Sequence, residues 1–182
     1  MFDKLHEECG VFGIYGHSEA AHMAYLGLYA LQHRGQESAG IAVSDGTRIR
    51  ALREMGYVAE IFTQPALETL PGHIAIGHTR YSTAGESAVA NAQPLLIECV
   101  HGQVGICHNG NIVNAREIRD ELVRQGSIFQ TNSDTEVALH LFARSQAPAI
   151  DDAIVESVAR LTGAFSFAFV TKDRLVAVRD PH

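Results

Sequence analysis

Short apolar runs, separated by glycine and polar residues, dominate the first half of the chain. The run GVFGIYG at 10–16 is typical of a buried strand. Residues 38–54 predict a hairpin, because the turn pair Asp45-Gly46 separates two strand-like segments. Further strands are expected at 73–82, 94–100, 103–109 and, as a closing hairpin, 164–180.

Apolar residues at helical spacing predict one helix near the N-terminus and three in the second half. These helices are expected at 18–34, 114–126, 133–145 and 151–163. Ser18 and Asn114 are the expected N-caps of the first two, Ser133 and Glu136 form a capping box for the third, and Gly126 ends the second. Strands and helices that are segregated in this way predict an α+β fold built in layers.

The composition excludes several classes of function. The chain has 182 residues, of which 46% are hydrophobic, enough for the core of one domain. The net charge is -7 and the basic segment Arg48–Arg53 reads as an exposed strand edge, so we expect no nucleic-acid partner. The leader MFDKLHEE lacks the apolar core of a secretory signal, and no apolar run reaches the length of a membrane span.

Cysteine and histidine usage favours a cytoplasmic protein without a metal site in this chain. Three cysteines and no signal argue against a disulfide framework, and we expect Cys99 and Cys107 to be packed in the core. The ten histidines include no HExxH pattern, and no CxxC pair is present. The chain stops at His182, directly after a predicted strand, so we expect one domain of a longer protein.

Cys9 lies between a short acidic leader and the first predicted strand. A free cysteine is most often a small buried hydrophobe, and the neighbouring Glu7 and Glu8 disfavour its thiolate. Cleavage before Cys9 would reverse this, because its new α-amino group, with a pKa of about 7.7–8.0, could act as the base for its own thiol.

Four other stretches carry candidate chemistry, each beside a structural alternative. Arg34, in QHRGQESAG, lies either in a connecting loop or in a functional one. Arg80, at the end of an apolar strand, is either a surface residue or a clamp for a carboxylate. Asn109-Gly110 is either a turn or an oxyanion hole, and Asp134 either caps a helix or holds an ammonium group. Together they describe glutamine as the substrate.

Five motifs occur in order along the chain: CGVFGI, QHRGQESAG, GHTRYSTAG, HNGN and SDTE. With them, the chain from Cys9 onward resembles the N-terminal glutaminase domain of the amidophosphoribosyltransferase family, one of the class II, N-terminal-nucleophile amidotransferases. The leader and the form HRGQES separate it from the aminosugar synthases, which begin at Met-Cys with a motif like YRGYDS. The alternatives are the glutaminase domain of another class II enzyme, such as glucosamine-6-phosphate synthase, or a silent regulatory domain of the same fold.

The resemblance implies a four-layer αββα sandwich in which residues 1–8 are a propeptide and residues 9–182 are the glutaminase domain. It also implies a thioester mechanism. Cys9 would be the nucleophile, and Asn109 and Gly110 would form the oxyanion hole. Arg80 and Thr83 would bind the glutamine carboxylate and Asp134 its ammonium group. Arg34 and Tyr81 match loop positions that order on substrate binding.

The acceptor half of the implied reaction needs parts outside this chain. The family uses the released ammonia to convert phosphoribosyl pyrophosphate to 5-phosphoribosylamine, the first step of purine synthesis, in a phosphoribosyltransferase domain that residues 1–182 lack. The resemblance implies no cofactor in this chain. For the complete enzyme it implies Mg²⁺, in some members a [4Fe–4S] cluster, and a homo-oligomer. Cys99 and Cys107 do not match the ligand motif of that cluster.

Overall fold

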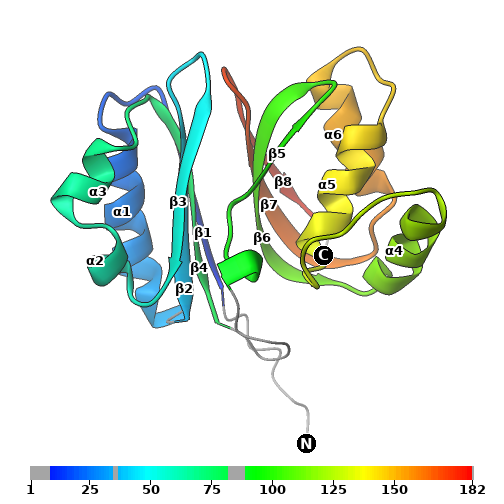
Figure 1. The fold of residues 1–182 in the computed structure, drawn as a ribbon, viewed down its shortest axis with the longest axis horizontal. Coiled ribbons are helices and arrows are strands. Elements are labelled where there is room, and N and C mark those ends of the chain that lie inside the picture. Colours follow the sequence, from blue (N-terminus) through cyan, green and yellow to red (C-terminus); the bar gives the residue numbers. More distant parts are fainter. Residues whose placement is uncertain (1–8, 35–36, 82–88, 182) are drawn as a thin grey trace, which may run out of the picture.

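Two antiparallel sheets lie face to face, and helices cover both outer faces (Figure 1). The computed structural model describes residues 9–34, 37–81 and 89–181. Within this part each sheet has four strands, in the orders β1-β4-β2-β3 and β5-β6-β7-β8. The predicted α+β, four-layer αββα sandwich is confirmed.

The first sheet consists of β1 (Gly10–Tyr15), β4 (Ile74–Arg80), β2 (Ser38–Ser44) and β3 (Ile49–Met55). The second consists of β5 (Leu95–Cys99), β6 (Gly102–Ile112), β7 (Gly163–Val170) and β8 (Leu175–Arg179). All the predicted strands are present. The basic strand β3 lies at a sheet edge, as its composition indicated.

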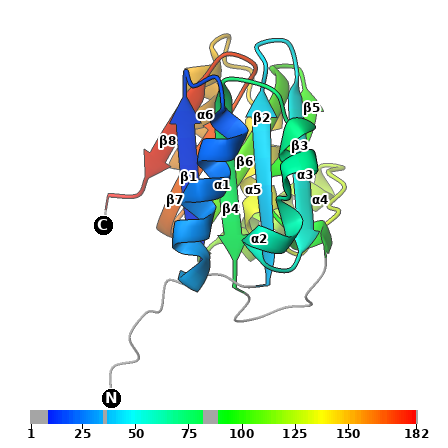
Figure 2. The same cartoon turned by 90° about the vertical axis from the view of Figure 1, so that its left-hand side faces the viewer.

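The helices divide between the two outer faces. The first sheet is covered by α1 (Ala20–Leu31), α2 (Val58–Ile61) and α3 (Gln64–Glu68), which Figure 2 shows from outside. The second is covered by α4 (Ala115–Arg124), α5 (Thr135–Arg144) and α6 (Ile150–Ala159). Two 3₁₀ turns, Gln32–Arg34 and Val89–Asn91, complete the described elements. The sequence pattern predicted the four long helices but not the short α2 and α3.

Side-chain alternation along the central strands builds three apolar layers. On β7, Phe165, Phe167 and Phe169 pack toward the helices, whereas Ala168 and Val170 pack between the sheets. Because both faces of such a strand are buried, its sequence is a nearly continuous apolar run instead of an alternating one. The same alternation fixes which side chains of β1, β4 and β6 point into the space between the sheets.

The predicted helix caps are confirmed at two positions and wrong at a third. The N-cap of α1 is Glu19 instead of Ser18, and the Glu19 N–H donates to His17 Nδ1 at 3.1 Å. Asn114 is the N-cap of α4, but its side chain bonds Arg160 O and Thr162 N instead of the helix. Gly126 follows the end of α4 as predicted, with a φ of 91° that favours glycine.

The predicted capping box of the helix 133–145 is also absent. The N-cap of α5 is Asp134, and the Glu136 carboxylate accepts hydrogen bonds from the N–H groups of Gln130 and Thr131, both at 2.8 Å. Glu136 therefore stabilises the preceding loop rather than the helix start. None of the helices in the described ranges is both long and apolar enough to cross a bilayer.

Candidate active site

The start of β1 and the ends of β4 and β6, which carry Cys9, Arg80 and Asn109, lie at one end of the sandwich, the lower end in Figure 1. Gly10 pairs with Thr79, which places Cys9 beside Arg80 at the end of β4. Val11, Ile76 and Cys107 pack between the sheets. Alternate residues of a strand share a face, so Cys9, Arg80 and Asn109 are directed to that same inter-sheet side.

A hydrogen bond between the sheets holds this end together. His78 Nε2 lies 2.9 Å from the carbonyl oxygen of His108, just before Asn109 on β6. His78 is fully buried, and burial lowers its pKa to about 3, so the ring is neutral near pH 7. A neutral ring with Nε2–H donates to the carbonyl, which ties β4 to β6 next to the candidate residues.

The Cys9 backbone is held by Arg34, which follows α1 in a 3₁₀ turn. Arg34 Nε donates to the Cys9 carbonyl oxygen at 3.0 Å, and Cys9 Sγ lies 3.9 Å from the Tyr81 carbonyl oxygen. The end of α1 can approach this closely because residue 10 is glycine. A Cβ there would lie 2.7 Å from Thr79 Oγ1 and 3.0 Å from Leu31 Cβ.

The Arg80 guanidinium is nearly buried and offers a hydrogen-bond donor that the described residues do not use. Its side chain is 14% exposed, and Nη1 lies 3.8 Å from Glu37 Oε1, beyond hydrogen-bonding distance. Within the described part of the chain this buried Nη1 has no hydrogen-bond partner. A guanidinium held in this way can receive a carboxylate in bidentate fashion.

Asn109 and Gly110 lie inside β6, which continues to Ile112, so the alternative that they form a turn is wrong. Gly110 has a φ of 133°, and a Cβ on it would lie 2.1 Å from Ala164 O of the neighbouring strand. No other residue fits there. Asn109 is half-buried, and no hydrogen bond from the described residues engages its side-chain amide.

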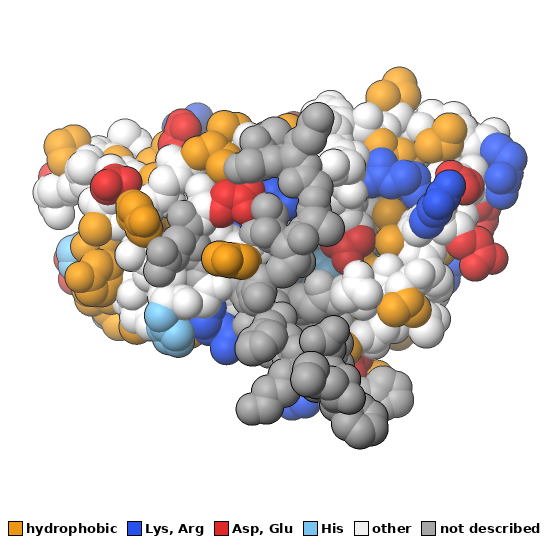
Figure 3. Space-filling view, turned by 90° about the horizontal axis from the view of Figure 1, so that it is seen from below, with side chains coloured by type: hydrophobic (Ala, Val, Ile, Leu, Met, Phe, Trp, Pro, Cys, Tyr) orange, Lys and Arg blue, Asp and Glu red, His pale blue; other side chains and the backbone are white. Residues whose placement is uncertain are grey.

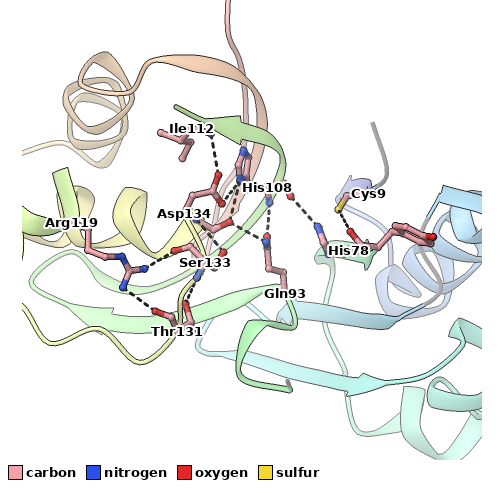
Figure 4. Close-up of polar contacts among 11 residues, drawn as sticks. Cys9, His78, Gln93, His108, Ile112, Arg119, Thr131, Ser133 and Asp134 are labelled. Atoms are coloured by element: carbon pink, nitrogen blue, oxygen red, sulfur yellow. Dashed lines mark hydrogen bonds and ion pairs between the residues drawn. The ribbon is translucent and has the colours of Figure 1, made fainter. Parts of the chain in front are cut away.

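Asp134 comes to this end from the start of α5. Its Oδ2 accepts from the Ile112 N–H at 3.1 Å, and its Oδ1 lies 3.4 Å from His108 Nδ1 (Figure 4). Burial alone would raise its pKa, but the bonds from His108 and Ile112 outweigh burial and lower the pKa. The side chain stays 29% exposed and forms no capping bond, so this carboxylate is ionised and open to a cation.

Four polar residues of this region were not predicted as parts of the site, namely His78, His108, Gln93 and Thr135. His78 and His108 interrupt apolar strands, and buried histidines of this kind need polar partners. Thr135 lies inside the SDTE motif but was given no role, and Gln93 lies in none of the motifs. Of the predicted site residues, Thr83 and the leader 1–8 lie outside the described residues. The Tyr81 side chain is 51% exposed, and its backbone carbonyl oxygen lies 3.9 Å from Cys9 Sγ.

Figure 3 shows this end from below, where acidic and basic side chains lie close to one another near the middle of the molecule. A cavity of about 560 Å³ lies elsewhere, beside β5 and α5, and its lining includes Arg53, Glu98 and His140. None of the candidate catalytic residues lines it. We therefore build the site on the polar groups at the lower end instead of on this cavity.

The other two cysteines differ from each other. Cys107 is fully buried between the sheets, and burial raises the pKa of its thiol. Cys99 is half-buried, with Sγ 3.6 Å from Gly102 O. The expectation of a packed core cysteine is thus confirmed for Cys107 and only partly met by Cys99. Within the described ranges no three His, Cys, Asp or Glu side chains are grouped as a metal site would require.

Comparisons with known proteins agree with this geometry. The family described as "Glutamine amidotransferase domain" matches residues 78–182. Amidophosphoribosyltransferase 2, chloroplastic, of Arabidopsis thaliana is 54% identical over 99% of this chain and 32% of its own length. Amidophosphoribosyltransferase of Staphylococcus aureus (strain MRSA252) is 48% identical over all of this chain and 37% of its own length. The chain thus spans about a third of these relatives.

Solved structures show the same fold. An allosteric regulatory enzyme of purine biosynthesis aligns with a TM-score of 0.90 and 45% identity over 94% of this chain and 37% of its own. The glutamine phosphoribosylpyrophosphate amidotransferase from B. subtilis, complexed with ADP and GMP, aligns with a TM-score of 0.88 and 44% identity over the same shares. By its sequence and by its fold, the chain belongs to the glutamine amidotransferase domain family.

Proposed function

We propose that this domain hydrolyses the side-chain amide of glutamine through Cys9 and supplies the ammonia to a phosphoribosyltransferase partner domain. The observation that carries the proposal is the meeting of Cys9, Arg80 and Asn109 on the inter-sheet side at one end of the sandwich. A thiol, a cation and an amide donor directed to one place fit the attack of a nucleophile on an amino-acid amide.

The first chemical step is the attack of Cys9 on the amide carbon. After removal of residues 1–8, the α-amine of Cys9 takes the thiol proton and the sulfur attacks. Negative charge develops on the amide oxygen, where the Asn109 side chain and the Gly110 N–H stabilise it. The amine then returns the proton to the leaving nitrogen, ammonia departs, and a thioester remains. Water hydrolyses the thioester and releases glutamate.

Substrate recognition uses two opposite charges. Arg80 binds the α-carboxylate of glutamine, with Thr83 as a second ligand, and Asp134 binds the α-ammonium group. Arg80 is supported in this role by its buried, incompletely bonded guanidinium, and Asp134 by its lowered pKa and its exposed edge. Arg34 and Tyr81 act next to Cys9, Arg34 by holding its backbone.

The proposed acceptor is phosphoribosyl pyrophosphate, because the relatives that match the whole chain are named amidophosphoribosyltransferases. That half of the reaction takes place outside residues 1–182. The Mg²⁺, the iron–sulfur cluster, the oligomer and the cytoplasmic location expected above stay predictions, and two relatives in Arabidopsis thaliana are named chloroplastic. A silent regulatory domain is disfavoured, because the chemical groups of the site are all present.

The test is a glutaminase assay on the full chain and on two cysteine variants. We expect the wild-type chain to release glutamate and ammonia from glutamine, Cys9→Ala to lose this activity, and Cys99→Ala to keep it. Cys99 is the matched control, since it is a second half-buried thiol remote from the site. A Cys9→Ala protein that still releases glutamate would remove the basis of the proposal.

A further inference from the structure

A buried polar network lies directly behind Asp134 (Figure 4). Its other members are His108 on β6, Thr135 on α5 and Gln93 in the segment before β5. Gln93 is 6% exposed, His108 3% and Thr135 0%. Buried polar groups are costly unless they bond one another, so a connected set at this depth fixes a single arrangement.

The hydrogen bonds of Gln93 set its orientation. Its Oε1 accepts the His108 backbone N–H at 2.7 Å, so its Nε2 must be the end that faces Thr135. Nε2 donates to Thr135 Oγ1 at 3.0 Å. Gln93 thus connects the strand that carries Asn109 to the helix that carries Asp134, with one bond to each.

The His108 ring completes the connection to Asp134. Nδ1 lies 3.1 Å from Thr135 Oγ1 and 3.4 Å from Asp134 Oδ1, and the ring stacks on Phe167. A proton on Nδ1 can be donated to either oxygen. A proton on Nε2 instead would be buried without a hydrogen-bond partner in the described structure and would leave a bare nitrogen facing the carboxylate. The Nδ1–H tautomer is therefore favoured.

The segment that carries Gln93 is itself fixed from the first sheet. Arg53 Nη1 donates to Ala92 O at 3.0 Å, and a Cβ at residue 40 would lie 2.2 Å from Gln93 O. Gly40 therefore lets this segment lie against β2. The network is anchored on both sheets, so Asp134 is placed relative to Cys9 and Arg80 and not only relative to its own helix.

We propose that Gln93, Thr135 and His108 are positioning residues that orient the Asp134 carboxylate toward the α-ammonium group of the substrate. They thereby set the preference for an α-amino acid amide over the same amide without its α-amino group. The inference rests on the proposed glutaminase function. It goes beyond that function by assigning the discrimination to three residues that do not touch the substrate.

The experiment compares glutamine with 5-amino-5-oxopentanoate, which lacks the α-amino group, as substrates of the full chain after maturation. The readout is the ratio of the two kcat/KM values. Thr135→Val keeps the shape of the side chain but removes the hydroxyl that joins Gln93 to His108. We expect the ratio to fall about tenfold or more, as for the loss of a hydrogen bond that supports a charged group. Thr135→Ser, the matched variant, should restore most of the ratio.

The outcomes separate this inference from the proposed function. A wild-type chain that hydrolyses neither amide overturns both. If the wild-type chain prefers glutamine and Thr135→Val shows the same ratio of kcat/KM values, the positioning role alone is overturned. If Thr135→Val does not fold, ¹⁵N NMR of the wild-type chain decides: His108 protonated on Nδ1 supports the inference, and protonation on Nε2 alone contradicts it.

Discussion

Arg34 holds the backbone of Cys9, with its Nε 3.0 Å from the Cys9 carbonyl oxygen. The two residues are 25 positions apart in sequence and are brought together because α1 packs its last turn against β1 at Gly10. The resemblance implied that Arg34 orders when substrate binds. The contact assigns it a further task, to fix the residue whose sulfur and amine are both expected to react.

Replacing Arg34 by methionine should therefore impair catalysis more than folding. We expect kcat for glutamine hydrolysis to fall about 10–100-fold, because small misplacements of a nucleophile reduce the rate strongly. Arg174→Met is the control, since the Arg174–Asp151 ion pair lies on the surface, with side chains 48% and 58% exposed, and should contribute little. Steady-state kinetics of both variants test this, and equal rates in the two would show that the Arg34 contact is dispensable.

Gly110 should tolerate no side chain. In Gly110→Ala the new Cβ would meet Ala164 O at 2.1 Å in a backbone conformation that side chains rarely adopt. We expect the free energy of unfolding to fall by about 2–4 kcal/mol and the activity to be lost. Gly102→Ala, on the same strand, also has positive φ but nothing within 4 Å, so only about 1 kcal/mol should be lost. Urea denaturation measures the free energy of unfolding of both variants. Gly102→Ala should be the more stable of the two, and equal stability would contradict the prediction.

The buried His78 should make stability depend on pH. Its folded-state pKa of about 3 lies below the unfolded value of 6.5, so as the pH falls the unfolded chain takes up this proton first. The stabilisation by the neutral His78 ring is complete above pH 6.5. As the pH is lowered from 6.5 to about 3, the free energy of unfolding should fall by about 1.4 kcal/mol per pH unit. Urea denaturation at several pH values should show this slope in the wild-type chain and a smaller one in His78→Gln. Equal slopes would mean that His78 is not the group that titrates.

Asp134 and Arg80 should act mainly on substrate affinity. Asp134→Asn and Arg80→Lys are each expected to raise the KM for glutamine about tenfold or more, because the first loses the charge and the second the bidentate geometry. Since the pKa of Asp134 is lowered from 3.8, the wild-type KM should show no inflection from this group between pH 5 and 8. Kinetics over that range measure both effects. Unchanged KM values in the two variants would place the amino-acid end of glutamine elsewhere.

The sequence predicted the strands and long helices well because their patterns are local. The turn at Asp45-Gly46 and the apolar run of β7 each depend on neighbouring residues alone. The cap interactions were predicted less well, because a cap residue can bond other partners. Asn114 is the N-cap of α4, but its side chain bonds Arg160 and Thr162, 46 and 48 positions away. Glu136 bonds the loop just before α5 instead of Ser133. The short helices α2 and α3 were missed because four or five residues carry too little periodicity to be recognised.

The residues of the candidate site also divide into those that the sequence indicated and those that it did not. Cys9, Arg80, Asn109 and Asp134 could be selected because each lies in a motif whose residue types suggest a chemical role. Gln93 lies in no motif, and Thr135 lies in SDTE without a residue type that suggests a role. The importance of both comes from a bond across 42 residues between a loop and a helix. The position of Gly110 inside a strand, at positive φ, likewise depends on its pairing with Phe165 on β7.

The most direct test of the account is the intact mass of the chain after incubation with a glutamine analogue that carries a diazoketone in place of the amide. The account predicts a chain that begins at Cys9 and carries one covalent adduct, which fragmentation places on Cys9 and which the Cys9→Ser variant lacks. A chain that starts at Cys9 without the adduct, or an adduct on Cys99 or Cys107 instead, would contradict the assignment of Cys9 as the nucleophile.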